Sequence, residues 1–237
     1  MAATTRCSTA TASASTRRAS RSSARNDEGC VSAALHGARL FTHGRNSAGE
    51  RVRIALRLKG LALRCVDAPA LPRATWRGIN PQGLMPALVL ADGRVVAQAT
   101  AILELIEELV PAPPLLPPDP IARAQARSFA QHIASDLHPV TVQRIRRQLP
   151  EASQAGWVAH WTAEALAALE AMLARRAVPL PFCYGTVPGW AEIHLVPQLR
   201  ASARLGCDLD PYPLLRGVAA RCDALAAFDL PPPDFGN

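Results

Sequence analysis

The chain has 237 residues, enough for one large domain or two small ones, and 49% of them are apolar. No apolar run approaches the roughly 20 residues that a membrane span needs, so the sequence predicts no association with a membrane. The net charge of +7 is spread along the chain, without a basic stripe interleaved with aromatic residues or a nucleic-acid-binding motif. The charge therefore favours small anionic ligands over nucleic acid.

The cysteines and histidines lack the spacing of a metal site. Neither Cys-x-x-Cys nor His-x-x-x-His occurs among the six residues of each type. The sequence therefore predicts no bound metal, and reduced thiols that mostly pack inside a cytoplasmic protein.

Residues 1–37 differ in composition from everything that follows. They are rich in Ser, Thr, Ala and Arg and show no hydrophobic period, which predicts a disordered extension. The same composition is typical of an organelle transit peptide, although a secretory apolar core is missing. A translation start assigned too far upstream would also produce it.

Residues 38–110 alternate strand and helix patterns. The pattern predicts a strand at 38–43, a helix at 50–60, a strand at 61–66, a short helix or loop at 72–80, a hairpin around Asp92-Gly93 and a helix at 100–110. An Asp-Gly pair between apolar runs is a strong hairpin signal. This order of elements is typical of an α/β thioredoxin-like domain.

The proline-rich stretch at 111–118 predicts a semi-rigid linker, and residues 119–230 predict an all-α domain. Asp119-Pro120 suits a helix start, with Pro at the first helical position. One helix carries an apolar stripe that predicts core packing, formed by Trp161, Ala165, Ala168, Leu169, Met172 and Leu173. Residues 231–237 are expected to form a tail.

The loop Arg45–Gly49 runs directly into the helix predicted at 50–60. Free backbone N–H groups at a helix N-terminus suit an anion or a thiolate. The alternative is an ordinary strand-to-helix connection with a polar cap.

Pro86 stands just before a predicted strand, where it cannot donate to a central ladder. A cis Met85–Pro86 bond would leave the N–H and C=O of Met85 facing outward, as an edge on which a peptide can add like a strand. The alternative is a trans proline that opens the hairpin.

Five separated motifs, in order over residues 39–228, resemble the zeta class of glutathione transferases. They are "RNSAGERVRIALRLKG", "INPQGLMPAL", "PLLPPDPIARAQAR", "SDLHPV" and "HLVPQLRASARLGCDLDPYPLL". The class contains maleylacetoacetate and maleylpyruvate isomerases, and "DLHPV" is most similar to the bacterial maleylpyruvate branch. The resemblance implies the glutathione transferase fold, a thioredoxin-like domain followed by an all-α domain.

The resemblance also implies a glutathione site. The Met85 backbone, beside a cis Pro86, would pair with the cysteinyl unit of glutathione. Gln98 and the adjacent Ala99 would meet the γ-glutamyl end, and His138 would be a further glutathione contact.

Catalytic residues follow from the same resemblance. Arg45, Asn46 and Ser47 would hold the thiolate and lower its pKa. Arg45, Arg144 and Arg204 would bind the carboxylates of the substrate, with Arg204 also in a catalytic role. Arg146 and Arg147 compete with Arg144 for its position.

Three positions depart from the family pattern. The catalytic serine of the family is Asn46 here, and the serine after Gln98 is Ala99, which removes a hydroxyl from the γ-glutamyl site. A helix-capping Thr-x-x-Asp is replaced by Gly189-Trp-Ala-Glu192, which predicts a weaker cap.

The resulting expectation is a dimeric, glutathione-dependent cis–trans isomerase of a small dicarboxylate, either maleylpyruvate or maleylacetoacetate. The departures at Asn46 and Ala99 keep two alternatives open. One is a protein of the same fold that binds without turnover, and the other is a general glutathione transferase.

Overall fold

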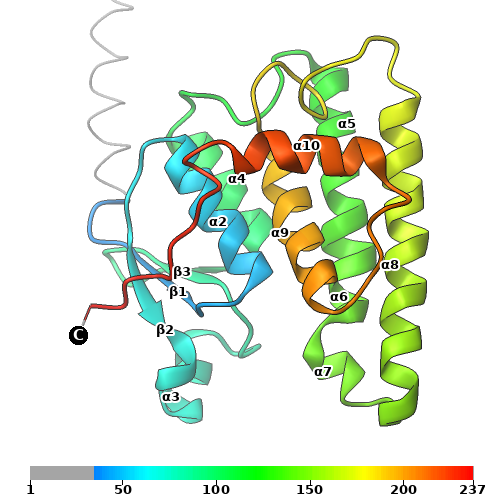
Figure 1. Cartoon of the computed structure of the whole chain (residues 1–237). Coiled ribbons are helices and arrows are strands. Elements are labelled where there is room, and N and C mark those ends of the chain that lie inside the picture. Colours follow the sequence, from blue (N-terminus) through cyan, green and yellow to red (C-terminus); the bar gives the residue numbers. More distant parts are fainter. Residues whose placement is uncertain (1–34, 237) are drawn as a thin grey trace, which may run out of the picture.

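The computed structural model describes residues 35–236, which form a sheet-containing domain and a helical domain side by side (Figure 1). The first domain has a four-stranded sheet in the order β2-β1-β3-β4. Strands β1 (Arg39–Thr42) and β2 (Arg64–Asp67) are parallel, whereas β3 (Ala87–Val89) is antiparallel to both β1 and β4 (Val95–Ala97). Its helices are α2 (Ser47–Leu58), α3 (Arg73–Ile79) and α4 (Ala99–Leu109), with a short 3₁₀ turn η1 (Ala68–Ala70). The predicted thioredoxin-like fold is confirmed.

Alternation along β1 divides this domain into two small cores. Leu40 points to the side covered by α2 and α4, where it packs in one cluster with Val52 and Ile102. Phe41 points to the opposite side and stacks on Trp76 of α3, with ring centroids 5.7 Å apart. Both faces of the sheet are therefore covered. Burial of each such side chain contributes about 1.5–3 kcal/mol.

The hairpin predicted around Asp92-Gly93 is present between β3 and β4. Leu90 N–H donates to Arg94 C=O at 2.8 Å, and the carboxylate of Asp92 accepts from Arg94 N–H at 3.0 Å. Gly93 has φ 87°, a backbone conformation that glycine adopts without strain.

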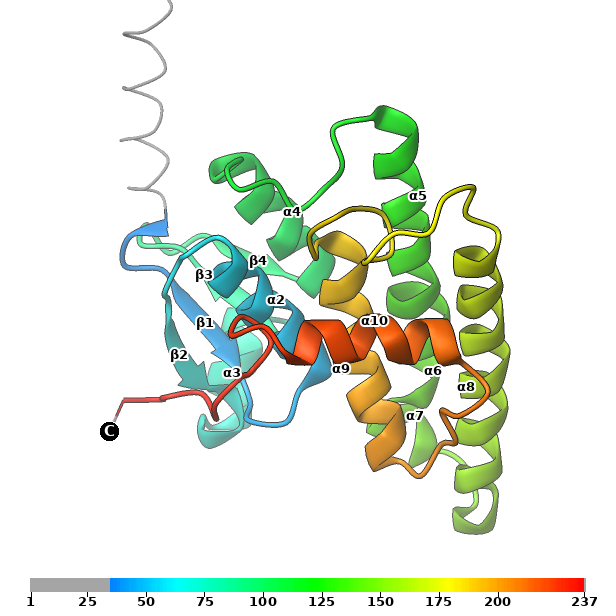
Figure 2. The same ribbon diagram turned by 45° about the horizontal axis from the view of Figure 1, so that its top comes forward.

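The second domain is helical throughout its regular structure. Its elements are α5 (Pro120–Gln131), the π-helical segment η2 (His132–Leu137), α6 (His138–Thr141), α7 (Gln143–Arg146), α8 (Glu151–Ala174), α9 (Trp190–Arg204) and α10 (Pro213–Asp223). Helix α9 is buried on nearly every side because α2, α5 and α10 all pack against it (Figures 1 and 2). Asp119 caps α5 as predicted, accepting from Ala122 N–H at 2.7 Å.

The apolar stripe predicted on α8 is partly wrong. Leu169 and Leu173 are buried, but Ala168 is exposed and Trp161 is 37% exposed. The buried face is formed by Val158, Thr162, Leu166, Leu169 and Leu173. Alanine and tryptophan extend the apolar surface around α8, so the sequence pattern does not determine which face of the helix is buried. The longer aliphatic side chains occupy the core.

The linker between the domains is fastened by Lys59, the only lysine of the chain. Its ammonium group forms an ion pair with Glu107 at 2.7 Å and donates to the carbonyls of Pro113, at 2.9 Å, and Val110. Glu107 in turn accepts from Leu115 N–H at 3.0 Å. The linker is therefore a packed segment that joins α2, α4 and the helical core.

The two ends of the chain differ from the prediction in one respect each. Residues 1–34 lie outside the described part, but the expected extension is too long at its C-terminal boundary, because Leu35 is buried in the core below β1. The tail returns to the first domain (Figure 2), where Arg53 donates to Pro231 C=O and Phe235 packs on the sheet core. None of the helices between residues 35 and 236 has the length and apolarity required to cross a membrane.

Candidate functional site

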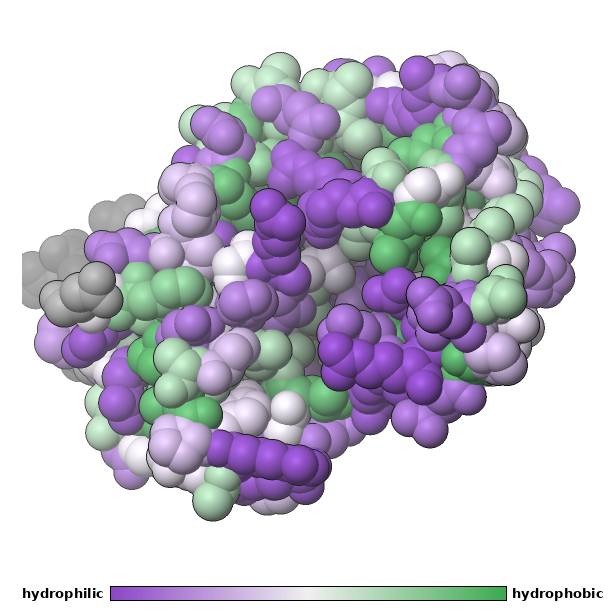
Figure 3. All heavy atoms as spheres, turned by 60° about the horizontal axis from the view of Figure 1, so that its bottom comes forward, coloured by the Kyte–Doolittle hydropathy of each residue, from purple (hydrophilic) through white to green (hydrophobic). Residues whose placement is uncertain are grey.

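A cavity of about 650 Å³ lies between the two domains. Figure 3 shows this face of the molecule, with a hollow bordered largely by hydrophilic residues. The cavity is lined by the loop after β1, the segment before β3, the start of α4, the segment from η2 to α7, and the end of α9. It brings together all the side chains predicted for the site: Arg45, Asn46, Ser47, Met85, Pro86, Gln98, Ala99, His138, Arg144 and Arg204.

The start of α2 presents free backbone donors to this cavity. The first helical hydrogen bond runs from Glu50 N–H to Asn46 C=O at 2.8 Å, and the Asn46 side chain makes no capping bond. The N–H groups of the first turn, from Ser47 onward, therefore remain for a ligand, and the alternative of a polar cap is wrong. Gly49 allows this geometry, because a Cβ there would lie 2.0 Å from Thr42 Oγ1 in β1.

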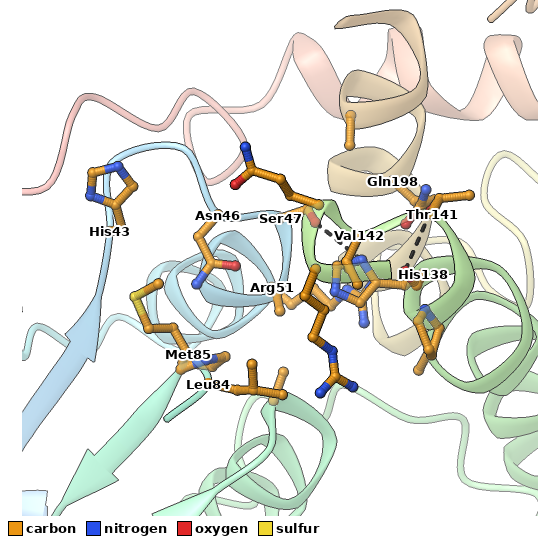
Figure 4. A pocket seen from close by; sticks show the side chains of 18 of the residues that line it. His43, Asn46, Ser47, Arg51, Leu84, Met85, His138, Thr141, Val142 and Gln198 are labelled. Carbon is orange, nitrogen blue, oxygen red and sulfur yellow. Dashed lines mark hydrogen bonds between the residues drawn. The ribbon is translucent and has the colours of Figure 1, made fainter. Parts of the chain in front are cut away.

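Asn46 itself contributes a donor without an acceptor. Its Nδ2 atom is buried and has no hydrogen-bond partner within residues 35–236. Figure 4 shows the side chain beside the cavity, between Ser47 and Met85. An amide N–H in this position can donate to an anion at the mouth of α2.

The segment before β3 has the geometry predicted for it. The Met85–Pro86 peptide bond is cis, so the trans alternative is wrong. Asn80 fixes the preceding turn by donating from Nδ2 to Leu84 C=O at 2.7 Å. Neither the N–H nor the C=O of Met85 is hydrogen-bonded within the described residues, so both can pair with an extended ligand.

Gln98 holds a strained backbone conformation at the start of α4. Its φ of 73° is the only positive φ of a non-glycine residue between residues 35 and 236. Such conformations occur preferentially at ligand sites. Its side chain donates to Gln82 Oε1 at 2.9 Å, while Ala99 and Thr100 line the cavity next to it.

A break in helix geometry brings His138 to the cavity from the second domain. Pro139 lacks an N–H, and the chain passes from the π-helical η2 into α6 at this point. The hydroxyl of Thr141 donates to Leu137 C=O at 3.0 Å and so satisfies one carbonyl of the interrupted helix.

His138 Nδ1 lies 3.4 Å from Ser47 Oγ, a contact that joins the two domains across the cavity (Figure 4). Burial first, and the charge of Arg51 second, lower the pKa of His138 to about 4. The imidazole is therefore neutral near pH 7 and faces Ser47 as a hydrogen-bonding group without charge.

Arginines dominate the charge of the cavity. Arg45 and Arg144 are exposed lining residues, and the side chain of Arg204 is 45% exposed. Arg146 also lines the cavity, whereas Arg147 does not. No aspartate or glutamate is among the lining residues, so the cavity attracts anions.

The N-terminal domain of glutathione S-transferases matches residues 47–109 as a family model. A maleylacetoacetate isomerase from Pseudomonas aeruginosa is 37% identical over 201 residues, which cover 80% of this chain and 93% of the relative. A solved maleylpyruvate isomerase of the zeta class superimposes with a TM-score of 0.75 at 34% identity, covering 80% of this chain and 94% of that one. The chain belongs to the zeta class of glutathione transferases.

A second solved relative of this zeta-class chain carries ligands. The maleylacetoacetate isomerase of Anaeromyxobacter dehalogenans, which was solved with dicarboxyethyl glutathione and citrate in its active site, has a TM-score of 0.72 at 39% identity. The match covers 84% of this chain and 92% of that one.

Arg51 and Gln198 are two lining residues of the zeta-class chain that the sequence did not single out. Arg51, in α2, is only 2% exposed, and burial lowers its pKa to about 10. Gln198, in α9, is buried, and its Oε1 has no partner in the described part of the chain. For Arg51 a signal existed: it is four residues from both Ser47 and Ala55, on the face that α2 buries.

The structure also explains the departure at Gly189. A Cβ at this position would lie 2.4 Å from Leu115 C=O, which accepts from Trp190 N–H at 2.8 Å. A threonine therefore does not fit beside the linker. The carboxylate of Glu192 accepts from Gly189 N–H at 2.8 Å and from Cys183 N–H at 2.6 Å, so it supplies the cap.

Proposed function

We propose that this chain is a glutathione-dependent cis–trans isomerase of a small unsaturated dicarboxylate, maleylpyruvate or maleylacetoacetate. The observation that carries the proposal is the cavity itself, in which arginines without an acidic lining residue surround the uncapped start of α2. This combination fits a thiolate and two carboxylates better than a neutral electrophile.

The residues fit glutathione at each of its three parts. The free N–H groups of the first turn of α2 and the unpartnered Nδ2 of Asn46 suit its sulfur. The unpaired Met85 backbone suits its cysteinyl unit. The start of α4 after Gln98 offers helix N–H groups to the γ-glutamyl carboxylate.

When bound, glutathione would supply a sulfur nucleophile for reversible addition to the cis double bond, which would permit rotation about that bond. Asn46 and Ser47 hold the sulfur by hydrogen bonds. Arg45, Arg144 and Arg204 bind the carboxylates and stabilise the negative charge that develops on the substrate. Neutral His138 orients the hydroxyl of Ser47 rather than serving as the base.

Two further features belong to the proposal. The protein acts in the cytoplasm, since its thiols are unpaired in the described residues and its family works on small soluble acids. It forms a two-fold dimer in which the first domain of one subunit meets the helical domain of the other. Light scattering at micromolar concentration tests the dimer, and a monomer would contradict it.

The activity is tested by following the loss of maleylpyruvate and of maleylacetoacetate absorbance with glutathione, with and without protein. The expected result is acceleration of at least one substrate well above glutathione alone. Absence of acceleration for both substrates would remove the proposal.

The departures at Asn46 and Ala99 favour one competing function, binding without turnover. Loss of a charge-assisted hydrogen bond costs about 1.5–3 kcal/mol, or roughly ten- to a hundred-fold in affinity. Calorimetry with glutathione separates the two: micromolar binding supports the enzyme, and undetectable binding at millimolar glutathione supports the alternative. A panel of electrophiles tests the third possibility, a general transferase.

A further inference from the structure

The guanidinium of Arg51 is a buried charge that the fold does not satisfy. It lines the cavity, and its Nε and Nη2 atoms have no hydrogen-bond partner between residues 35 and 236. Buried polar groups in native proteins are nearly always paired, and an unpaired buried charge is costly. A charge kept at this cost requires an explanation other than stability.

Two histidines, a glutamine and one glutamate are the polar groups connected with Arg51. His138 and His194 both lie close enough for its charge to lower their pKa values, in addition to the larger effect of burial. Gln198 also lines the cavity, and its Oε1 has no partner in the described residues. Glu50, the residue preceding Arg51, is the acidic group whose charge acts on it.

Arg51 lies near the start of α2. It follows Ser47 by one helical turn on the same face of α2, and both residues line the cavity. The other arginines of the cavity, Arg45, Arg144, Arg146 and Arg204, are at least partly exposed to solvent. Water screens their charge, whereas the charge of a buried guanidinium acts at a low effective dielectric.

We propose that Arg51 is the buried counter-charge for an anionic sulfur at the start of α2, which it stabilises through its field. The proposal rests on the proposed function, with glutathione as the ligand. When the thiol of bound glutathione loses its proton to water, the anion that remains adds a second negative charge near Arg51, whose Nε and Nη2 atoms have no hydrogen-bond partner in the described residues. Arg51 then favours ligand chemistry at the expense of stability.

The test measures the pKa of the bound glutathione thiol from thiolate absorbance between pH 5 and 10, in wild type and Arg51→Met. Opposite charges several ångströms apart in a protein shift a pKa by about one unit or more. Arg51→Met is expected to raise the thiol pKa by about one unit, and so to lower the thiolate fraction roughly tenfold below that pKa. Arg51→Lys is expected to keep most of the lowering.

Arg53→Met is the matched control, since Arg53 lies on the same helix but donates to the tail and does not line the cavity. It is expected to leave the thiol pKa unchanged. Arg51→Met is also expected to melt at the same or a higher temperature than wild type, because it removes an unpaired buried charge.

A thiol pKa in folded Arg51→Met equal to that of wild type would overturn the proposal while leaving the proposed function intact. If Arg51→Met does not fold, Arg51→Gln makes the same comparison, and failure of both to fold would assign Arg51 a structural role. Wild type that binds no glutathione would instead overturn the proposed function, and this inference with it.

Discussion

The two ends of α2 each carry a buried cation, and their surroundings are opposite. At the C-terminal end, the ammonium of Lys59 contacts one carboxylate and two carbonyls. At the N-terminal end, the guanidinium of Arg51 has two nitrogens without any partner in the described residues. A buried charge that is fully paired serves the fold, and one that is left unpaired next to a cavity is available to a ligand.

Composition supports this distinction. The chain has 26 basic residues, and Lys59 is the only lysine. A compact ammonium with three donors suits the three acceptors around it, whereas the planar fork of arginine does not. The one lysine of the chain thus stands where three acceptors surround an ammonium group.

The largest effect is expected at the paired end. Lys59→Met should destabilise the protein by about 3–5 kcal/mol, because it leaves Glu107 partly buried without its cation. For a chain of this size, that corresponds to a loss of roughly 6–20 °C in Tm. Thermal melting of Lys59→Met and of Arg51→Met compares the two ends of α2 directly. Equal changes in Tm would contradict the distinction between a paired and an unpaired buried cation.

At the unpaired end, the expected effect is a pH dependence of stability. Burial first, and the charge of Arg51 second, lower the pKa of His194 to about 3, against 6.5 for an ordinary histidine. Between these values the unfolded chain takes up a proton that the folded chain does not. The contribution of His194 is therefore fully present above pH 6.5 and is lost as the pH falls.

Denaturant titrations at pH 6.5 and 4.5 measure this loss. His194→Gln should remove about 2–3 kcal/mol of the acid destabilisation over these two pH units. Double substitution of His194 and Arg51 should show that the two effects are coupled, since Arg51 acts on the same imidazole. An acid loss in His194→Gln as large as in wild type would show that His194 accepts its proton without penalty.

The third effect concerns turnover. Arg204 stands in the last turn of α9 with its side chain 45% exposed, so Arg204→Ala should change stability by no more than about 0.5 kcal/mol. Removal of a hydrogen bond to a substrate carboxylate costs about 1.5–3 kcal/mol, or roughly a ten- to hundred-fold loss in kcat/KM. Arg204→Lys should restore part of it. Unchanged kinetics in the alanine variant would remove Arg204 from the site, and a collapse in Tm would make it structural.

Local patterns predicted the parts of the molecule whose geometry is set within a few residues. The Asp92-Gly93 hairpin, the cap at Asp119 and the turn before Pro86 are of this kind. The ten predicted site residues that line the cavity followed from the family resemblance, which carries long-range information that periodicity lacks.

The errors and omissions arise mainly from contacts between distant segments. Trp161 was placed in the core because sequence does not show which apolar face of α8 meets its neighbours. The reason for glycine at 189 was not visible in the sequence, because it lies in the close approach of Leu115. Arg51 was missed as a site residue because an arginine in a helix is usually exposed, and its burial depends on α9.

The smallest effect is expected from Glu50, the acidic neighbour of the unpaired end. Its carboxylate lies 3.9 Å from Arg204 Nη2 without a hydrogen bond, so the donors of Arg204 remain free for a ligand. A substrate carboxylate bound to Arg204 would then lie near a second negative charge. Glu50→Gln keeps the shape of the side chain and removes that repulsion. Pairs at partly exposed sites are worth up to about 1 kcal/mol, so KM for the dicarboxylate should fall about two- to fivefold with little change in kcat.

Asp223→Asn provides the matched control for Glu50→Gln. Arg200 lies on α9 one turn before Arg204, and it pairs with Asp223 at 2.6 Å. Neither Arg200 nor Asp223 lines the cavity. It should leave KM unchanged. A higher KM in Glu50→Gln would mean that Glu50 holds Arg204 in its binding position, and that both charges beside the unpaired end of α2 serve the ligand. A lower KM would mean that Glu50 limits the positive charge around Arg51 and Arg204, so that the cavity binds its dianion less tightly than its arginines alone would allow.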